Sequence, residues 1–328
     1  MNAQTRTTVK RAIKTAFASP LGWRTLGVAL RAPGVIVLTY HRIVGAEPSL
    51  PGISVAHFAA QMKWIRENCE PIGPDALVER SRAPRRVRPA VLVTFDDGYR
   101  SYHDLAYPVL KQYDIPALNF VVTSLLDEPG MLWTDRVQWA ALTTPRTSVC
   151  VPWMNGGAWV PLPDRAARES FGLAARTLLK TVPNALRAER VEEIVAMLGG
   201  APPRERQMTN WEEVRRTMDL TTYGGHTHTH AILSRLDRED AAREIRACRD
   251  RLAAETGRAP LFFAYPNGTQ SDFTAETQHL LRESGFQVSF STIDGIAGAA
   301  TDWMAVRRIA SIDADVSAFV WIAAGLAS

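Results

Sequence analysis

The sequence VRPAVLVTFDDG, residues 87–98, predicts a buried strand that stops at charged residues. Val91 to Phe95 is a short run of apolar, mostly β-branched side chains, and Asp96, Asp97 and Gly98 end it abruptly. In parallel α/β folds, polar residues just past the carboxyl end of a buried strand usually carry the chemistry, because that edge opens onto a crevice. The two aspartates are therefore the first candidates for a functional site.

Strands and helices alternate on both sides of this stretch. Strand-like apolar runs are VIVLTY (35–40), ALNFVVT (117–123), LTTYGG (220–225), LFFAYP (261–266), QVSFST (287–292) and MAVRRIAS (304–311). Helices are expected after the cap Ser54, after the capping box Asn210–Glu213, at about 101–113, 238–256 and 273–284, and near the end. Alternation implies parallel strands joined by crossovers, hence an α/β fold, either an open doubly wound sheet or a βα barrel.

The chain divides by composition into a basic arm and one large domain. It has 328 residues, 46% hydrophobic and 22% charged, as expected of an ordered globular protein. Residues 1–46 hold seven basic and no acidic side chains, although the net charge of the whole chain is only +4. We assign residues 1–33 to an N-terminal arm and 34–328 to the domain. Residues of about 127–207, where tryptophans sit among Pro and Gly before helices near 164–180 and 184–198, form an expected insertion.

The composition of the N-terminal arm gives indications of where the protein is located and what it binds. Its apolar side chains Phe17, Leu21, Trp23 and Leu26 could bind an anionic membrane surface, or the arm could pack as a solvated helix on the outside of the domain. Charge, Pro and Gly interrupt every apolar run before it could cross a bilayer or serve as a signal peptide. We expect a cytoplasmic protein, at the inner face of the membrane if the arm binds there. The mixed charges beyond residue 50 argue against a nucleic-acid partner.

A second motif, GGHTHTHAIL at 224–233, follows another predicted strand end. Catalytic zinc sites typically use three protein ligands and leave one position open. His226 and His230 are four residues apart and could converge on one ion if the loop turns, with an aspartate as third ligand. In an extended strand the three histidines, His228 included, would spread too far for joint binding. A surface histidine cluster without function is the alternative.

The aspartate pair could hold two different roles. Adjacent carboxylates at a strand end point in different directions, so one could bind a metal while the other acts as a base towards water. The simpler alternative is that one aspartate caps the helix after Gly98 and the other is solvated.

Together these residues resemble the polysaccharide deacetylase family, whose members carry T-F-D-D-G and H-[ST]-x-x-H motifs. Here the motifs are Thr94 to Gly98 and His226 to His230. The resemblance implies a distorted (β/α) barrel with an inserted helical segment, and it covers the chain from about residue 34 apart from the insertion. It assigns Asp96 as general base and Asp97, His226 and His230 as ligands of a divalent metal, zinc first, with cobalt, nickel or manganese as alternatives. His228 falls on a variable position, and Thr227 matches a hydroxyl residue that steadies the loop.

The third family motif, usually F-R-x-P-Y-G, departs from the pattern here, because residues 263–268 read FAYPNG. The arginine and the tyrosine are missing. A backbone N–H at Asn267 could still bind the oxyanion, and Arg308 is our candidate to replace the arginine that orients the base, with a surface position as the alternative. The late histidine of many members has no equivalent, since His279 lies in a helical stretch. His41, after a Tyr-His strand end like that of biofilm-polysaccharide deacetylases, is the candidate acid, or else a buried histidine bonded to backbone.

The resemblance implies a metal-dependent hydrolase that releases acetate from an N-acetylated amino sugar. A polysaccharide or lipid-linked glycan of exopolysaccharide or surface-glycan synthesis would suit the arm and the expected location. Tryptophans of the insertion could stack on sugars, although core packing is favoured. Two other hypotheses remain open: hydrolysis of another amide, such as a formamide or a cyclic imide, and a non-catalytic glycan-binding descendant.

Overall fold

The computed structural model describes residues 22, 23, 25, 33–46, 49–84, 86–126, 130–200, 203 and 205–323. In this part of the chain a parallel sheet has the strand order β11-β10-β9-β6-β5-β1-β12, and β4 pairs with β5 beside it. The strands are β1 (Val35–Tyr40), β4 (Glu70–Pro71), β5 (Ala90–Phe95), β6 (Ala117–Val121), β9 (Thr221–Gly225), β10 (Phe262–Ala264), β11 (Val288–Phe290) and β12 (Ile309–Ala310). The predicted parallel α/β architecture is confirmed.

Residues 306–310 bring the two ends of this sheet together. Val306 forms a parallel bridge with Phe290 of β11, and three residues later Ile309, followed by Ala310, pairs with β1. The prediction of one continuous strand over 304–311 was wrong, because the segment leaves β11 before it joins β1. This crossing curls the sheet into the expected distorted barrel.

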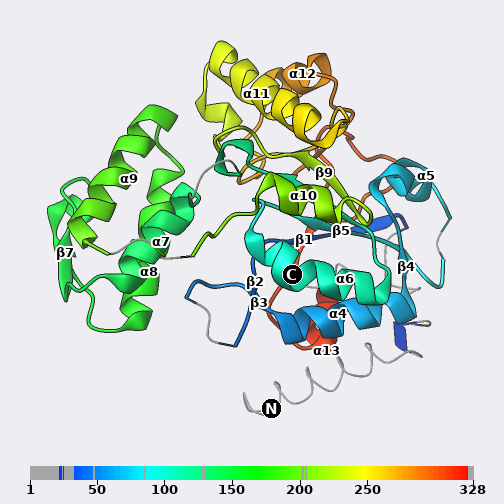
Figure 1. Ribbon diagram of the computed structural model, residues 1–328, viewed down its shortest axis with the longest axis horizontal. Coiled ribbons are helices and arrows are strands. Elements are labelled where there is room, and N and C mark those ends of the chain that lie inside the picture. Colours follow the sequence, from blue (N-terminus) through cyan, green and yellow to red (C-terminus); the bar gives the residue numbers. More distant parts are fainter. Residues whose placement is uncertain are drawn as a thin grey trace, which may run out of the picture.

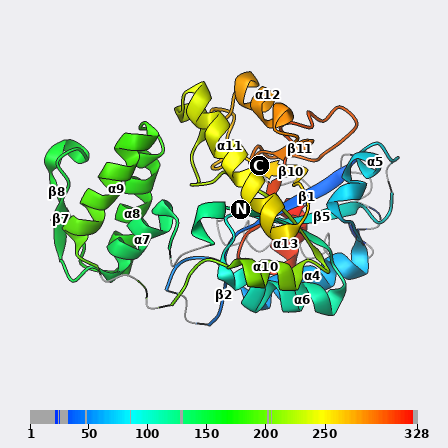
Figure 2. The same ribbon diagram turned by 45° about the horizontal axis from the view of Figure 1, so that its top comes forward.

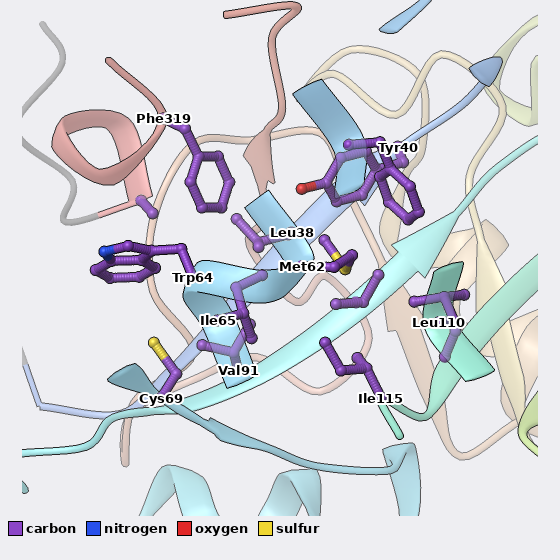
Figure 3. Close-up of a cluster of buried hydrophobic side chains, with 14 of the residues drawn as sticks. Leu38, Tyr40, Met62, Trp64, Ile65, Cys69, Val91, Leu110, Ile115 and Phe319 are labelled. Atoms are coloured by element: carbon purple, nitrogen blue, oxygen red, sulfur yellow. The ribbon is translucent and has the colours of Figure 1, made fainter. Parts of the chain in front are cut away.

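Alternate residues of the strands face opposite sides of the sheet. Val37 and Leu92 lie in an inner cluster with Phe120 and Phe290, whereas Leu38 and Val91 belong to an outer cluster under the helices. Figure 3 shows this outer cluster, where Trp64, Ile65, Leu110 and Phe319 come from three helices and surround the strand residues. The two clusters hold the sheet between an apolar interior and a helical layer, so the strand ends are fixed in position.

The helices of the barrel cover its outside in two groups (Figures 1 and 2). Helices α4, α6 and α13 lie together on one side, and α11 lies beside α12 on the other. Their bounds are α4 (Val55–Asn68), α5 (Leu77–Ser81), α6 (Tyr107–Tyr113), α10 (Trp211–Thr217), α11 (Arg238–Thr256), α12 (Ala275–Glu283) and α13 (Val316–Ala323). Ser54 caps α4, and Asn210 with Glu213 forms the expected capping box of α10.

A separate group of helices, α7 (Trp133–Thr143), α8 (Arg165–Leu179) and α9 (Asn184–Leu198), lies to one side of the barrel (Figure 1, green). These helices share a small core with the hairpin of β7 (Ser148–Cys150) and β8 (Trp159–Pro161). The predicted helices near 164–180 and 184–198 are present, whereas α7 was missed. We call residues 133–198 the side subdomain; that it is an insertion stays a prediction.

Most of the N-terminal arm lies outside the described residues, so its contact with a membrane stays a prediction. Trp23 is described, and its side chain is fully buried. Its indole lies edge-on to Trp64 of α4, with ring centroids 4.7 Å apart, and donates to the carbonyl of Asn68. Trp23 therefore packs on the barrel and is not available to insert into a bilayer. None of the described helices has the length and apolar character needed to cross a membrane.

Candidate active site

The carboxyl ends of five parallel strands surround one cavity of about 420 Å³. His41 follows β1, the two aspartates follow β5, His226 follows β9, Asn267 comes shortly after β10, and Thr292 shortly after β11. The side subdomain supplies a further part of the wall through Trp133, Thr134, Asp135, Arg176 and Lys180. The residues that complete the lining are Tyr99, His230, Ile232 and Thr269.

Asp96 points into the mouth of the barrel. Leu92, Thr94 and Asp96 are alternate residues along β5 and its end, so they face the same side of the sheet, and Leu92 faces the interior. The two carboxylate oxygens of Asp96 accept hydrogen bonds of 2.7 Å each from the two terminal nitrogens of Arg308. Arg308 is 1% exposed and also donates to Thr94 Oγ1 and to the carbonyl of Ser291. The neighbouring Arg307 is exposed, as strand alternation predicts. Arg308 therefore occupies the position expected of the residue that orients the base, and the alternative of a surface arginine is wrong.

This pair decides the charge of Asp96. Burial alone would raise the pKa of Asp96, but the Arg308 guanidinium outweighs burial and holds the pKa below its ordinary value. Arg308 itself lies above the inner aromatic rings, 5.7 Å from the centroid of Phe120 and 6.0 Å from that of Phe290. An ionised carboxylate is thus fixed at the top of an apolar core, where it can accept a proton.

Asp97, His226 and His230 form a group that could hold a metal ion. One ligand atom from each residue lies within 4.8 Å of the others, and all three residues are buried. Asp97 Oδ1 is 3.4 Å from His226 Nε2 and 3.3 Å from His230 Nε2. Burial would raise the pKa of Asp97, but hydrogen bonding to the two histidines holds it well below its ordinary value. One carboxylate and two imidazoles are the donor set of a catalytic zinc site.

The ring of His226 is oriented by the barrel. Its Nδ1 is 2.7 Å from the carbonyl oxygen of Ala264, so Nδ1–H donates there and Nε2 is the ring nitrogen that faces Asp97. A backbone carbonyl behind a metal-binding histidine fixes both tautomer and ring plane in this way. The residues present therefore fit a divalent metal.

Unusual backbone conformations concentrate at the site. Of the six non-glycine residues with positive φ in the described chain, Asp97, Thr227, His230 and Asn267 lie here, with φ between 59° and 79°. A β-branched residue such as Thr227 rarely adopts this conformation, and such strain persists mainly at functional sites. These turns bring His226 and His230 together within the loop, whereas we had expected the turn into the following helix to do so.

His228 is turned away from the metal group. Its Nδ1 lies 2.9 Å from Thr123 Oγ1. The loop is held by two side chains: Thr227 Oγ1 accepts from the backbone N–H of Ala231, and the carboxylate of Glu244 on α11 accepts from the N–H groups of His228 and Thr229. Thr227 thus has the expected steadying contact, whereas Glu244 was missed, because nothing in a helix sequence marks which loop it faces.

His41 and Asn267 lie at the rim of the cavity. The His41 side chain is 51% exposed, and its Nε2 is 3.9 Å from Asp96 Oδ2, so the alternative of a buried structural histidine is wrong. Asn267 has φ 63°, and the described residues offer its backbone N–H no acceptor. Its side chain accepts from Lys180 Nζ and donates to Asp272. By contrast, His279 is exposed on α12 and pairs with Glu283.

Sequence reasoning missed a second buried ion pair beside the site. Arg42 Nη2 is 2.5 Å from the carboxylate of Asp135, and its guanidinium lies 3.9 Å from the ring centroid of Tyr99. Arg42 comes from the end of β1 and Asp135 from the first turn of α7, so this pair joins the barrel to the side subdomain. The only sign in the sequence that Arg42 lies near the site is its position next to His41.

Comparison with known proteins supports the same fold and family. The chain is 27% identical over 123 residues to the poly-beta-1,6-N-acetyl-D-glucosamine N-deacetylase of Escherichia coli O157:H7, a match that covers 36% of this chain and 18% of that relative. The chain thus spans less than a fifth of the length of that relative.

Two solved structures share the fold. The deacetylase PplD of Streptococcus pyogenes, solved with acetate, has a TM-score of 0.59 and 16% identity over 89% of this chain and 99% of its own. IcaB from Ammonifex degensii has a TM-score of 0.58 and 21% identity over 90% of this chain and 99% of its own. At these identities the likeness concerns the fold alone.

The family model for polysaccharide deacetylases matches residues 84–144 and 170–289, more than half of the chain. The matched residues include both carboxylates after β5 and the histidine loop after β9, which the structure brings together in one cavity. The chain therefore belongs to the polysaccharide deacetylase family.

Proposed function

We propose that this protein is a metal-dependent hydrolase that removes N-acetyl groups from amino sugars of an exopolysaccharide or of its lipid-linked precursor. The observation that carries the proposal is the Asp96–Arg308 pair beside the Asp97–His226–His230 group, within one cavity. The first arrangement supplies a base and the second a metal site, and metal-assisted amide hydrolysis uses both.

Asp96 is the proposed base. Its carboxylate is ionised and buried, and Arg308 fixes both of its oxygens, so its position towards an attacking water is set before substrate binds. A protein that only bound a glycan would gain nothing from a buried carboxylate of this kind. The ion pair therefore favours hydrolysis over a non-catalytic descendant.

Asp97, His226 and His230 would hold the divalent metal, with zinc as our first choice. When bound, such an ion lowers the pKa of water towards about 7 and polarises a carbonyl oxygen. Asn267 lines the same cavity, and its backbone N–H, which has no acceptor among the described residues, would donate to the acetyl oxygen as negative charge develops on it. Loss of one such donor in comparable sites costs about 2.7–4 kcal/mol in transition-state stability.

His41 is the proposed acid for the departing amine. Its imidazole lies on the open side of Asp96, where the sugar nitrogen of a bound substrate would reach it. Its exposure keeps it in contact with solvent, from which it can take up a new proton after each turnover.

The names of relatives support the substrate class. The relative in Escherichia coli is named as an N-deacetylase of poly-beta-1,6-N-acetyl-D-glucosamine, and the match covers a part of its length. We infer that this chain acts on N-acetylglucosamine or a closely similar amino sugar.

Acetate release from a panel of substrates tests the proposal. The metal-loaded protein is incubated with β-1,6- and β-1,4-linked N-acetylglucosamine oligomers, a lipid-linked N-acetylglucosamine, a formamide and a cyclic imide. We expect acetate from at least one amino sugar, none from the Asp96→Asn variant, and unchanged release from a His279→Asn control, whose histidine lies outside the cavity. Glycan binding without turnover at every metal loading would overturn the proposal, and turnover of only the formamide or the imide would replace it.

A further inference from the structure

Two basic side chains of the side subdomain line the catalytic cavity. Arg176 and Lys180 are both half-buried and stand four residues apart at the end of α8, so they share one face of the helix. Like charges at this spacing repel each other and destabilise a helix. Their position beside the metal group therefore calls for a ligand that offsets the repulsion.

Neither side chain has an acidic partner within 4.0 Å in the described part of the chain. Arg176 donates through Nε to the carbonyl of Gly172, and Lys180 donates to the amide oxygen of Asn267 at 2.6 Å. The carboxylates that act on them, Asp135 on Arg176 and both Asp272 and Asp97 on Lys180, do so only at a distance and have hydrogen-bond partners of their own. Burial lowers the pKa of both cations, and the charge of Arg176 lowers that of Lys180 further.

Two further donors at this wall lack an acceptor among the described residues. Trp133 lines the cavity, and its indole N–H is buried without a hydrogen bond. The guanidinium of Arg187 lies 5.0 Å from the Trp133 ring centroid; Arg187 is 3% exposed, and its Nη1 also has no partner. This wall thus offers donors and positive charge but few acceptors.

The charge balance of the site also favours an anionic ligand. In and directly behind the cavity, five carboxylates face five basic side chains, so their formal charges cancel: Asp96, Asp97, Asp135, Asp272 and Glu244 against Arg42, Arg176, Lys180, Arg187 and Arg308. The divalent metal of the proposed function adds two positive charges without a counter-ion. A neutral polymer of N-acetylglucosamine would leave this excess uncompensated.

We infer that the substrate carries an anionic group next to the acetylated sugar, and that Arg176 and Lys180 bind this group. The inference rests on the proposed function and narrows its substrate class. A guanidinium binds phosphate or carboxylate through two parallel hydrogen bonds, and an ammonium adds a point charge. The anion could be the phosphate or diphosphate of a carrier-linked sugar, or the carboxylate of an acidic sugar in the chain.

Substrates that differ in charge test the inference and distinguish the two sources. Acetate release by the zinc-loaded protein is measured with a neutral N-acetylglucosamine trimer, with UDP-N-acetylglucosamine and with an oligomer that alternates N-acetylglucosamine and glucuronate. We expect a higher kcat/KM for one anionic substrate than for the trimer. In the Arg176→Gln/Lys180→Gln double variant this preference should fall about tenfold or more, through KM, since the hydrogen bonds from both charged groups to the anion are lost.

Arg165→Gln is the matched control, because Arg165 lies on the same helix, is exposed and pairs with Glu169. It removes one positive charge of that helix outside the cavity and should leave the preference within about twofold, as expected of surface substitutions. An equal preference in the wild type and the double variant would overturn the inference.

Calorimetry tests the anion site independently of catalysis, so that failure of the anion site can be told from failure of the proposed function. Binding of N-acetylglucosamine 1-phosphate and of N-acetylglucosamine is compared in the zinc-loaded Asp96→Asn protein, with and without the double substitution. Phosphate-dependent binding that is lost with Arg176 and Lys180 supports the anion site even if no substrate releases acetate. If the double substitution leaves the phosphate-dependent binding unchanged, the metal alone binds the phosphate. That result would refute the anion site.

Discussion

Replacement of Arg308 with methionine should leave a buried carboxylate without its counter-ion. The side chain makes two 2.7 Å hydrogen bonds to Asp96 and two more to Thr94 and Ser291, with 1% of its surface exposed. Removal of one partner from such a pair costs about 3–5 kcal/mol. Since a chain of 328 residues has an unfolding entropy of about 0.7 kcal/mol per K, Tm should fall by about 4–7 °C.

The pH dependence gives this prediction a second readout. In the wild type the lowered pKa of Asp96 contributes stability at neutral pH that is lost as the pH falls through that pKa. Without the guanidinium, burial raises the pKa of Asp96 above its unfolded value, so the sign reverses and the variant loses stability as the pH rises. The penalty of Arg308→Met should therefore be larger at pH 7 than at pH 4.

The assay is urea unfolding of the metal-free protein, with a double-mutant cycle that adds Asp96→Asn. We expect the double variant to be more stable than the sum of the single costs predicts, because the second change removes the unpaired charge. Arg307→Met is the matched control, since it makes the same substitution at an exposed neighbour. A cost below about 1 kcal/mol for Arg308→Met, or strictly additive costs, would refute the assignment of Arg308 as the partner of the base.

Three further predictions concern the loops of the site. His228→Ala should leave the metal content of the purified protein unchanged, because its imidazole contacts Thr123 and not the metal group; loss of metal would contradict the division of the three histidines. Glu244→Gln should weaken metal affinity by about tenfold in a competition titration with a chelator, since its carboxylate orients the histidine loop, and an unchanged affinity would show that the loop needs no such support. Gly98→Ala should cost about 1–2 kcal/mol of unfolding free energy, because φ is +81° and a Cβ would lie 3.1 Å from Val121 Cγ1; a neutral result would contradict the tight turn after Asp97.

The strand ends and the polar residues that follow them could be predicted, because both are marked by short, contiguous stretches of sequence. The apolar run before Asp96 predicts a buried strand, and in a parallel sheet the residues that follow such strands must meet at one edge. On this ground an aspartate could be grouped with His226 and His230, although they come from two distant motifs, and the resemblance to the family then singled out Asp97. Arg308 could be selected over Arg307 only by strand alternation, which holds because its segment bridges β11 and β1.

The rest of the cavity depends on long-range packing that no local pattern encodes. Helix α7 was missed because Pro129 and Gly130 before it and Pro145 after it suggested an irregular segment, and with it the Arg42–Asp135 pair that joins the side subdomain to the barrel. In the sequence, Arg176 and Lys180 look like ordinary basic residues of an amphipathic helix. Only the position of the side subdomain against the strand ends shows that they line the cavity. A side chain that reaches a site from another layer of the fold leaves no periodic signal in the sequence.

The central claim is that one metal site and one separate base share this cavity, and metal analysis joined to acetate release tests it most directly. Both are measured on the same preparations of the wild type, Asp97→Ala and Asp96→Asn. The account predicts one divalent ion per chain and turnover in the wild type, neither in Asp97→Ala, and the ion without turnover in Asp96→Asn. A full metal complement in Asp97→Ala, or acetate release by Asp96→Asn at the rate of the wild type, would contradict it.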